Sequence, residues 1–187
     1  MTDSQTGTYS AISRANHWIV SLAFFGMLAV GFYLEYGGLT REARGPIMAL
    51  HKATGTVLLI VVAWRVIWRL RQGFPAFAAG AMPGWQVMAS KAVHWALLAA
   101  IIVMPLSGVL GSLFGGRPID IYGLFLIPPF EKNEAIKSAA GFAHTVTAYA
   151  LAGLIFVHVA AAIKHHLIDK DATLVRMLTG RAATAEA

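Results

Sequence analysis

The chain has 187 residues, of which 57% are hydrophobic and only 13% are charged, and it contains no cysteine. Soluble domains carry roughly 25% charged residues, so this composition favours a single-domain integral membrane protein. The absence of cysteine excludes disulfides, cysteine-ligated iron–sulfur clusters and covalently attached c-type haem. The formal net charge of +6 does not indicate nucleic-acid binding, because the basic residues lie at the ends of apolar runs rather than in one patch.

Four long apolar runs follow one another along the chain. Each has close to the roughly 20 residues that a helix needs to cross a bilayer, and backbone groups in lipid must be paired within the segment. The runs cover residues 17–36, 52–70, 93–114 and 142–164. Because short connections make consecutive helices antiparallel neighbours, residues 1–187 are predicted to form one all-α domain, a four-transmembrane-helix bundle.

The three connections and the tail differ in composition. The first connection, about 37–50, is short, and the second, about 71–91, is irregular and re-enters a helix near Trp85. The third, about 115–141, is the longest and ends in “EKNEAIKSAAG”, which predicts a short surface helix. A polar tail follows Ile168. No cleavable signal sequence is expected, because residues 1–16 are polar and the first apolar run has no small-residue cleavage pattern before Glu35.

Basic residues are shared unevenly between the two sides of the expected bundle. An even number of spans places both termini on the same side, and nine of the 15 Lys and Arg residues then lie on that side. Loops on the cytoplasmic side of a membrane carry an excess of Lys and Arg. The sequence therefore predicts a multi-pass membrane protein with both termini in the cytoplasm.

Histidines occur within or at the start of all four runs. His17, His51 and His94 open the first three, and the stretch “FAHTVTAYALAGLIFVHVAAAIKHH” of the fourth contains His144 and His158. The last two are 14 residues apart, which is about 21 Å along a helix axis and close to four full turns, so they share a face at two depths. By depth, His51 matches His144, and His17 matches His158. Two such cross-helix pairs fit two bis-histidine haems stacked across the bilayer.

Other interpretations of these residues stay open. A lone histidine within a membrane helix is more often a hydrogen-bonded packing residue than a ligand, and a zinc site or a proton relay would also use histidine. His94 lies at the depth of His17 and is a rival inner ligand. Arg65 follows His51 by 14 residues and so lies on the same face at the inner level. It would either pair there with an anionic group, such as a haem propionate or a quinone head group, or extend to the surface.

Several segments, taken in order, point to a known family. They are “RANHW” at 14–18, “MALHKATG” at 48–55, “WRVIWRLR” at 64–71, “KAVHW” at 91–95, “MPLSG” at 104–108 and “AHTVTAYALAGLIFVHVAAAIKHH” at 143–166. Together these segments resemble the prokaryotic cytochrome b561 family, and the resemblance covers the chain from about residue 9 to residue 178. The ordered set of histidines is the specific part of the resemblance, and the third connection is its least similar part.

The resemblance implies two non-covalent haem b groups and assigns ligands to them. The inner haem would be held by His17 with His158, and the outer haem by His51 with His144. Two further histidines, His94 and His165, match family positions that do not ligate haem and lie near the inner haem and the quinone region. Two arginines match basic positions near the inner haem. They are Arg14 and Arg65.

The resemblance also implies a location in the bacterial inner membrane, and a function. Family members of the best-understood type pass electrons from superoxide at the outer face to ubiquinone, and we expect ubiquinone or another membrane quinone here. We place the quinone end on the inner side, where its hydrogen-bond donors and proton carriers would be Arg14, Lys91, His94 and His165. Lys52 directly follows a proposed ligand and is the leading candidate for attracting the superoxide anion.

Two other classes of function remain open at this stage. One is an electron-transfer subunit that serves a hydrogenase, a dehydrogenase or a soluble redox partner on the outer side. The other is a membrane protein without a redox function. Absorbance bands of b-type haem in the purified protein would separate the second from both redox functions.

Overall fold

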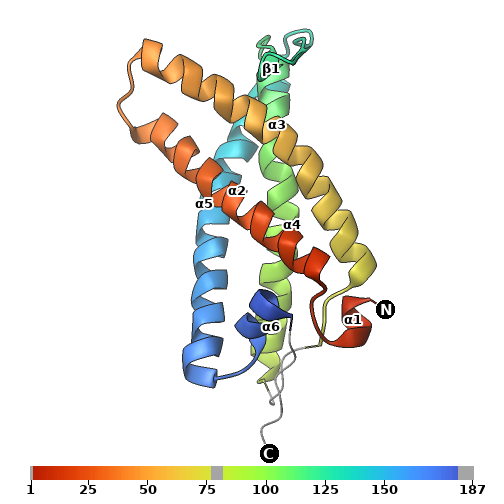
Figure 1. Cartoon of the computed structure of the whole chain (residues 1–187). Coiled ribbons are helices and arrows are strands. Elements are labelled where there is room, and N and C mark those ends of the chain that lie inside the picture. Colours follow the sequence, from red (N-terminus) through yellow and green to blue (C-terminus); the bar gives the residue numbers. More distant parts are fainter. Residues whose placement is uncertain (1, 77–81, 181–187) are drawn as a thin grey trace, which may run out of the picture. The chain divides into compact units, whose positions relative to one another are not determined.

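The computed structural model describes residues 2–76 and 82–180, which form helices and a small β-hairpin (Figure 1). The long helices are α2, α3, α4 and α5, which comprise Ala11–Tyr36, Arg41–Gln72, Gly84–Leu113 and Glu134–Lys164. The short elements are α1 (Asp3–Thr6), β1 (Ile119–Ile121), β2 (Phe125–Ile127), a π-helix (His165–Asp169) and α6 (Thr173–Thr179).

Four helices of the described chain are long and apolar enough to cross a membrane, which confirms the predicted all-α membrane class. All four begin earlier than their apolar runs, and caps are seen ahead of α3 and α5. The hydroxyl of Thr40 accepts a hydrogen bond from the Ala43 amide at 3.4 Å ahead of α3, and Asn133 Oδ1 accepts one from the Ile136 amide at 3.0 Å ahead of α5. These caps let charged turns join the helices. The predicted surface helix is therefore the first part of α5.

Contacts along the chain define two compact units. The terminal unit comprises residues 1–19, 64–98 and 153–187, and the hairpin unit comprises residues 20–63 and 99–152. Each of the four long helices contributes one segment to each unit.

A buried ion pair holds the N-terminal segment inside the terminal unit. Asp3 Oδ2 lies 3.3 Å from Arg69 Nη1, and the two side chains are only 2% and 6% exposed. The Ser13 hydroxyl donates to the same carboxylate at 2.5 Å, and the Ser10 amide donates to it at 3.0 Å. The Arg69 guanidinium also lies 5.1 Å from the centre of the Tyr9 ring. Asp3 thus fastens the start of the chain to α3.

Removing this carboxylate is expected to destabilise the protein. Asp3→Ala leaves the Arg69 guanidinium buried without a counter-charge, and breaking a buried pair in this way costs about 3–5 kcal/mol. Glu134→Ala is the matched control, because the Glu134–Lys137 pair is largely solvent-exposed and such surface pairs contribute little to stability. Denaturant unfolding followed by circular dichroism measures both changes. Equal decreases in the free energy of unfolding of the two variants would contradict the role assigned to Asp3.

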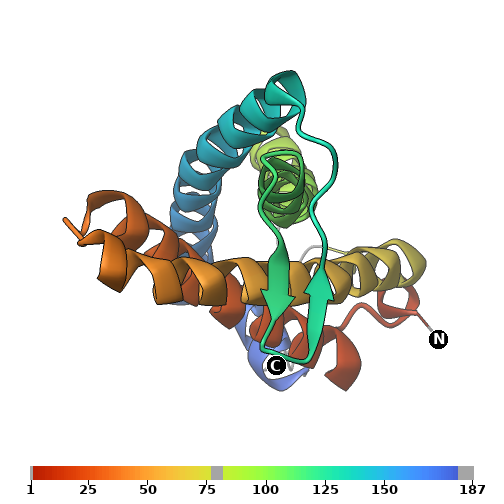
Figure 2. The same ribbon diagram turned by 90° about the horizontal axis from the view of Figure 1, so that it is seen from above.

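The hairpin unit contains the two strands, which the sequence did not predict. β1 and β2 pair antiparallel, with Ile119 opposite Ile127 and Ile121 opposite Phe125. The turn between them has positive φ at both Tyr122 and Gly123, which turns the chain tightly. Each strand has three residues, too few for an alternating pattern to be visible. Figure 2 shows the strands crossing over α3, to which the hairpin is bonded through the hydroxyls of Tyr122 and Thr54 at 3.0 Å.

Candidate functional site

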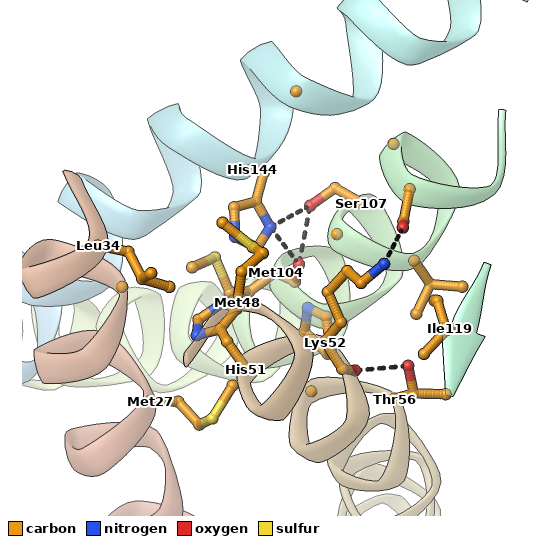
Figure 3. Close-up of a pocket in the computed structure, with 18 of the residues that line it drawn as sticks. Met27, Leu34, Met48, His51, Lys52, Thr56, Met104, Ser107, Ile119 and His144 are labelled. Carbon is orange, nitrogen blue, oxygen red and sulfur yellow. Dashed lines mark hydrogen bonds between the residues drawn. The ribbon is translucent and has the colours of Figure 1, made fainter. Parts of the chain in front are cut away.

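A cavity of about 410 Å³ lies in the hairpin unit (Figure 3). Its volume is within the range of about 300–1,000 Å³ that is usual for small-molecule and cofactor sites. Side chains from all four long helices and from β1 line it, and most are apolar. Those labelled in Figure 3 include Met27, Leu34, Met48, Met104, His51 and His144. The cavity therefore combines an apolar wall with two imidazoles.

The two imidazoles come from different helices and lie close together. The ring centres of His51 on α3 and His144 on α5 are 6.3 Å apart. A metal ion bound to one nitrogen of each ring at about 2 Å would separate the ring centres by roughly 6 Å, because each nitrogen is about 1 Å from its ring centre. The observed separation therefore fits one metal ion between the rings.

The hydrogen bonds of the pair agree with a ligand role. His144 Nδ1 lies 2.9 Å from the Met104 carbonyl oxygen and 3.3 Å from the Ser107 hydroxyl. A proton on Nδ1 that is donated to the carbonyl leaves a lone pair on Nε2, as in metal-ligating histidines. His51 Nδ1 is buried and has no hydrogen-bond partner among the described residues. Such an unpaired buried atom calls for a ligand or water.

A basic side chain borders the same cavity. Lys52 Nζ donates to the Pro118 carbonyl at 2.6 Å and to the Ser112 hydroxyl at 3.2 Å, so its ammonium group is held between α3, α4 and the start of the hairpin. The other charged residues that line the cavity are three basic and one acidic. They are Arg44, Arg117, Lys137 and Glu35. The charge around the cavity is therefore positive, which suits an anionic group.

Three histidines meet in the terminal unit. The ring centre of His158 lies 6.2 Å from that of His17 and 5.4 Å from that of His94. Only the first separation matches the roughly 6 Å expected for two rings that share a metal ion. His94 Nδ1 donates to the Ser90 carbonyl at 2.7 Å and its ring packs against Phe74, with ring centres 5.6 Å apart. His94, the rival ligand named from the sequence, therefore lies in the same cluster as His17 and His158.

Arg65 contacts a proposed ligand directly. One guanidinium nitrogen, Nη2, lies 2.9 Å from His17 Nδ1. Because a guanidinium can only donate, Nδ1 accepts this bond and the His17 proton is on Nε2. A metal bound at Nε2 requires the proton to be on Nδ1, where it would exclude the Arg65 contact. The terminal pair therefore fits a metal by its ring separation, provided that Arg65 turns away when the metal binds.

His165 forms a cluster with two carboxylates that the sequence analysis missed. Its Nδ1 lies 2.6 Å from Asp171 Oδ2 and 3.0 Å from Asp169 Oδ2. The π-helix and the bond from the Asp171 amide to the His165 carbonyl at 3.1 Å bring these residues together. Both aspartates lie where the sequence indicated only a polar tail, and no sequence pattern marks a single π-helical turn.

The charge of Asp171 sets the tautomer of His165. Burial alone would raise the pKa of the Asp171 carboxyl, but hydrogen bonds from Thr173 and the contact with His165 outweigh it and lower that pKa. The carboxylate is therefore charged near neutral pH and accepts the Nδ1 proton. His165 Nε2 is left available to exchange a proton with another group.

The four residues predicted for a quinone site all lie in the terminal unit, but the structure does not join them in one network. Arg14 Nη1 donates to the Tyr9 carbonyl at 3.0 Å, and Lys91 is exposed. Within residues 2–76 and 82–180, no hydrogen bond, ion pair or ring contact connects Lys91 or His165 to His94. The quinone site therefore stays a prediction.

These features define a class: a multi-pass helical membrane protein in which histidines from different helices form pairs spaced for a metal cofactor. The chain belongs to the prokaryotic cytochrome b561 family, whose model matches residues 8–180. It is consequently a membrane electron-transfer protein of the oxidoreductase type, and the family implies that it binds b-type haem.

Curated relatives agree with this assignment. The chain is 34% identical over 178 residues to “Cytochrome b561 homolog 2” of Escherichia coli K12, a match that covers 91% of this chain and 90% of the relative. “Cytochrome b561 homolog 1” of the same organism is 29% identical, covering 88% and 93%. “Probable superoxide oxidase CybB” of Yersinia pestis is 25% identical, covering 91% and 95%.

Gly108 allows His144 to pack against α4, which gives a test of this site. A Cβ atom at position 108 would lie 3.0 Å from His144 Cε1, closer than ordinary packing permits. Gly108→Ala is therefore expected to shift the imidazole and to lower the haem content of the purified protein. Gly26→Ala, whose Cβ meets nothing within 4 Å, is the control and should keep full haem content. A pyridine haemochrome assay measures both, and unchanged haem in Gly108→Ala would contradict the close packing.

Proposed function

We propose that this protein is a di-haem cytochrome of the bacterial inner membrane that transfers electrons from superoxide to a membrane quinone. The observation that carries the proposal is the presence of two histidine pairs with nearly equal ring separations, 6.3 Å in the hairpin unit and 6.2 Å in the terminal unit. Such spacing in two separate units fits two bis-histidine haems, and it supports the proposal together with the family, which implies b-type haem.

Each unit would hold one haem. In the hairpin unit the ligands are His51 and His144, and in the terminal unit they are His17 and His158. Bound haem with two histidine ligands supplies one-electron chemistry and has no open iron position for oxygen. The residues orient the group, and the apolar wall of the hairpin-unit cavity keeps water away from it. Release of Arg65 from His17 would free its guanidinium for an anionic partner such as a haem propionate.

The donor end is assigned to the hairpin unit on the outer side of the membrane. The name of the Yersinia pestis relative supports superoxide as the donor, and the basic lining of the cavity supports an anion. Lys52 is held in place by two hydrogen bonds, so its charge is presented at a fixed point beside His51. A positive charge at this point would raise the rate of encounter with a small monoanion.

The acceptor end is assigned to the terminal unit on the cytoplasmic side, in keeping with the excess of basic residues on the side of the termini. Quinone reduction consumes two protons, so a proton carrier is needed near the membrane surface. His165 with its two aspartates meets this need best, because Nδ1 is fixed by Asp171 and Nε2 is free to exchange a proton. His94, Lys91 and Arg14 would complete the hydrogen-bond donors around the quinone head group.

Stopped-flow absorbance with superoxide tests the whole proposal. The b-type haem bands are expected to show reduction on mixing, and reoxidation when ubiquinone is present. The rate of reduction should fall as ionic strength rises, because charge steering is screened within about 8 Å near physiological salt. Lys52→Gln should lower the rate by roughly a few-fold and flatten the salt dependence. Arg41→Gln is the control, since Arg41 is exposed and does not line the cavity.

Two outcomes would contradict parts of this proposal. A reduction rate that does not depend on salt would remove the electrostatic role of Lys52. A chain that binds haem but does not react with superoxide would favour a docked protein, such as a hydrogenase, a dehydrogenase or a soluble cytochrome, as the electron donor.

A further inference from the structure

The β1–β2 hairpin exposes apolar side chains at its turn. Tyr122 is 51% exposed, Leu124 is 86% exposed, Phe125 is 66% exposed and Leu126 is 58% exposed. Turns of hairpins that face water are usually formed by Gly, Asn and Asp. An apolar turn of this kind, on a protein that already contacts lipid, needs a covering partner.

Charge is almost absent from this segment. Asp120 is the only charged residue between Pro118 and Phe130. Its carboxylate is used within the turn, where Oδ1 accepts a hydrogen bond from the Gly123 amide at 2.9 Å. Apart from this one carboxylate, the segment presents aromatic and aliphatic groups, which is a composition suited to the boundary between lipid head groups and acyl chains.

The other end of the hairpin is bound to the protein. Ile119 is buried and lines the cavity, and the Pro118 carbonyl just before it accepts a hydrogen bond from Lys52. The Tyr122 hydroxyl is bonded to Thr54 of α3. Figure 2 shows that the strands cross α3 and that the turn lies beyond it. The turn consequently lies past α3, while the start of β1 remains at the cavity.

The hydrogen bonds that join the hairpin to α3 show where it lies along that helix. Lys52 and Thr54 lie at the start of an apolar run long enough to cross a bilayer, and the hairpin follows the last residue of α4, Leu113, after a short connection. On α3, Val57 and Ile60 are 38% and 72% exposed. The Tyr122–Thr54 hydrogen bond thus places the turn beside the start of the apolar run of α3, on which Val57 and Ile60 are exposed.

We infer that the turn of the β1–β2 hairpin inserts into the lipid head-group and acyl-chain boundary and anchors the wall of the hairpin-unit cavity to the membrane surface. Insertion covers the four exposed side chains, and the Tyr122–Thr54 and Lys52–Pro118 hydrogen bonds join the anchored turn to α3. The inference depends on the membrane location of the chain and does not depend on the electron donor or on quinone.

Site-directed fluorescence can test this insertion, because the chain contains no cysteine and one introduced thiol is labelled uniquely. Leu124→Cys is labelled with a small environment-sensitive fluorophore in the full-length, haem-loaded protein, which is then placed in phosphatidylethanolamine and phosphatidylglycerol nanodiscs. Glu131→Cys, at a nearby exposed position, is the control. Haem absorbance confirms that both variants are folded, and Phe125→Cys serves as a second probe should Leu124→Cys fail to fold.

Opposite quenching patterns are expected at the two positions. Lipids with a nitroxide on the upper acyl chain should quench the label at position 124 several-fold more than the label at position 131, and aqueous iodide should do the reverse. Equal quenching of both labels by iodide would overturn the inference. So would a label at position 124 that is shielded from both quenchers, because that result indicates a protein partner or a second copy of the chain covering the turn.

Discussion

Replacing His51 or His144 by alanine is expected to remove one haem from the purified protein and to leave the other in place. Each histidine would contribute one of the two ligands proposed for the haem of the hairpin unit, and a b-type haem has no covalent attachment to retain it when a ligand is lost. Haem content should fall by about half. The pyridine haemochrome assay gives the stoichiometry, and a redox titration should show one component where the unaltered protein shows two.

The matching experiment addresses the terminal unit. His17→Ala or His158→Ala should remove the other redox component and keep the first. His94→Ala is the decisive control, because His94 also lies beside His158 but at a ring separation of 5.4 Å instead of 6.2 Å. Loss of a haem in His94→Ala together with full haem content in His17→Ala would show that the pairing in this unit has been assigned wrongly.

Quinone reduction is expected to slow strongly when His165 is replaced by alanine, while haem content stays unchanged. A positioned proton carrier contributes about 100-fold or more to a reaction that takes up protons, so reoxidation of the reduced haems by quinone should slow on the order of 100-fold. His166→Ala provides the matched control, because His166 is the neighbouring histidine and is exposed to solvent. Stopped-flow mixing of the reduced protein with a soluble ubiquinone analogue measures the rates.

Asp171→Asn refines this test. The amide keeps the size of the side chain but removes the charge that orients His165, and a smaller loss of roughly ten-fold is expected for a residue that acts through another. Because hydrogen bonds hold the pKa of Asp171 below its usual value, the carboxylate stays charged across the neutral range. Normal reoxidation in His165→Ala and in His94→Ala would place the quinone elsewhere.

The membrane class and the positions of the four long helices could be predicted from the sequence. Hydropathy and length are local properties of the sequence. A run as long and apolar as 142–164 is typical of a helix that crosses a membrane. The helix boundaries were less predictable. Charged turns before the apolar runs of α3 and α5 carry no hydropathy signal, and their caps, Thr40 and Asn133, are recognised only once the hydrogen bonds are seen.

The depth pairing of the histidines was also within reach of the sequence. A spacing of 14 residues between His144 and His158 is a property of one helix and follows from its regular geometry. The structure places His51 beside His144 and His17 beside His158, while their role as ligands stays a prediction. The choice of His17 over His94 comes from the family resemblance, because both histidines open a run at the same depth, and the ring separations of 6.2 and 5.4 Å to His158 favour it without testing it.

The sequence by itself determined that this chain is a helical membrane protein with histidines at matching depths in separate spans, since these properties depend on composition and on the helical repeat. Only the tertiary structure showed which side chains are brought together by segments of irregular backbone. The π-helical turn brings His165 to Asp169 and Asp171, and the hairpin carries the Pro118 carbonyl to Lys52. Contacts of this kind depend on the path of the chain between helices, and single turns and three-residue strands have no periodicity from which that path could be inferred.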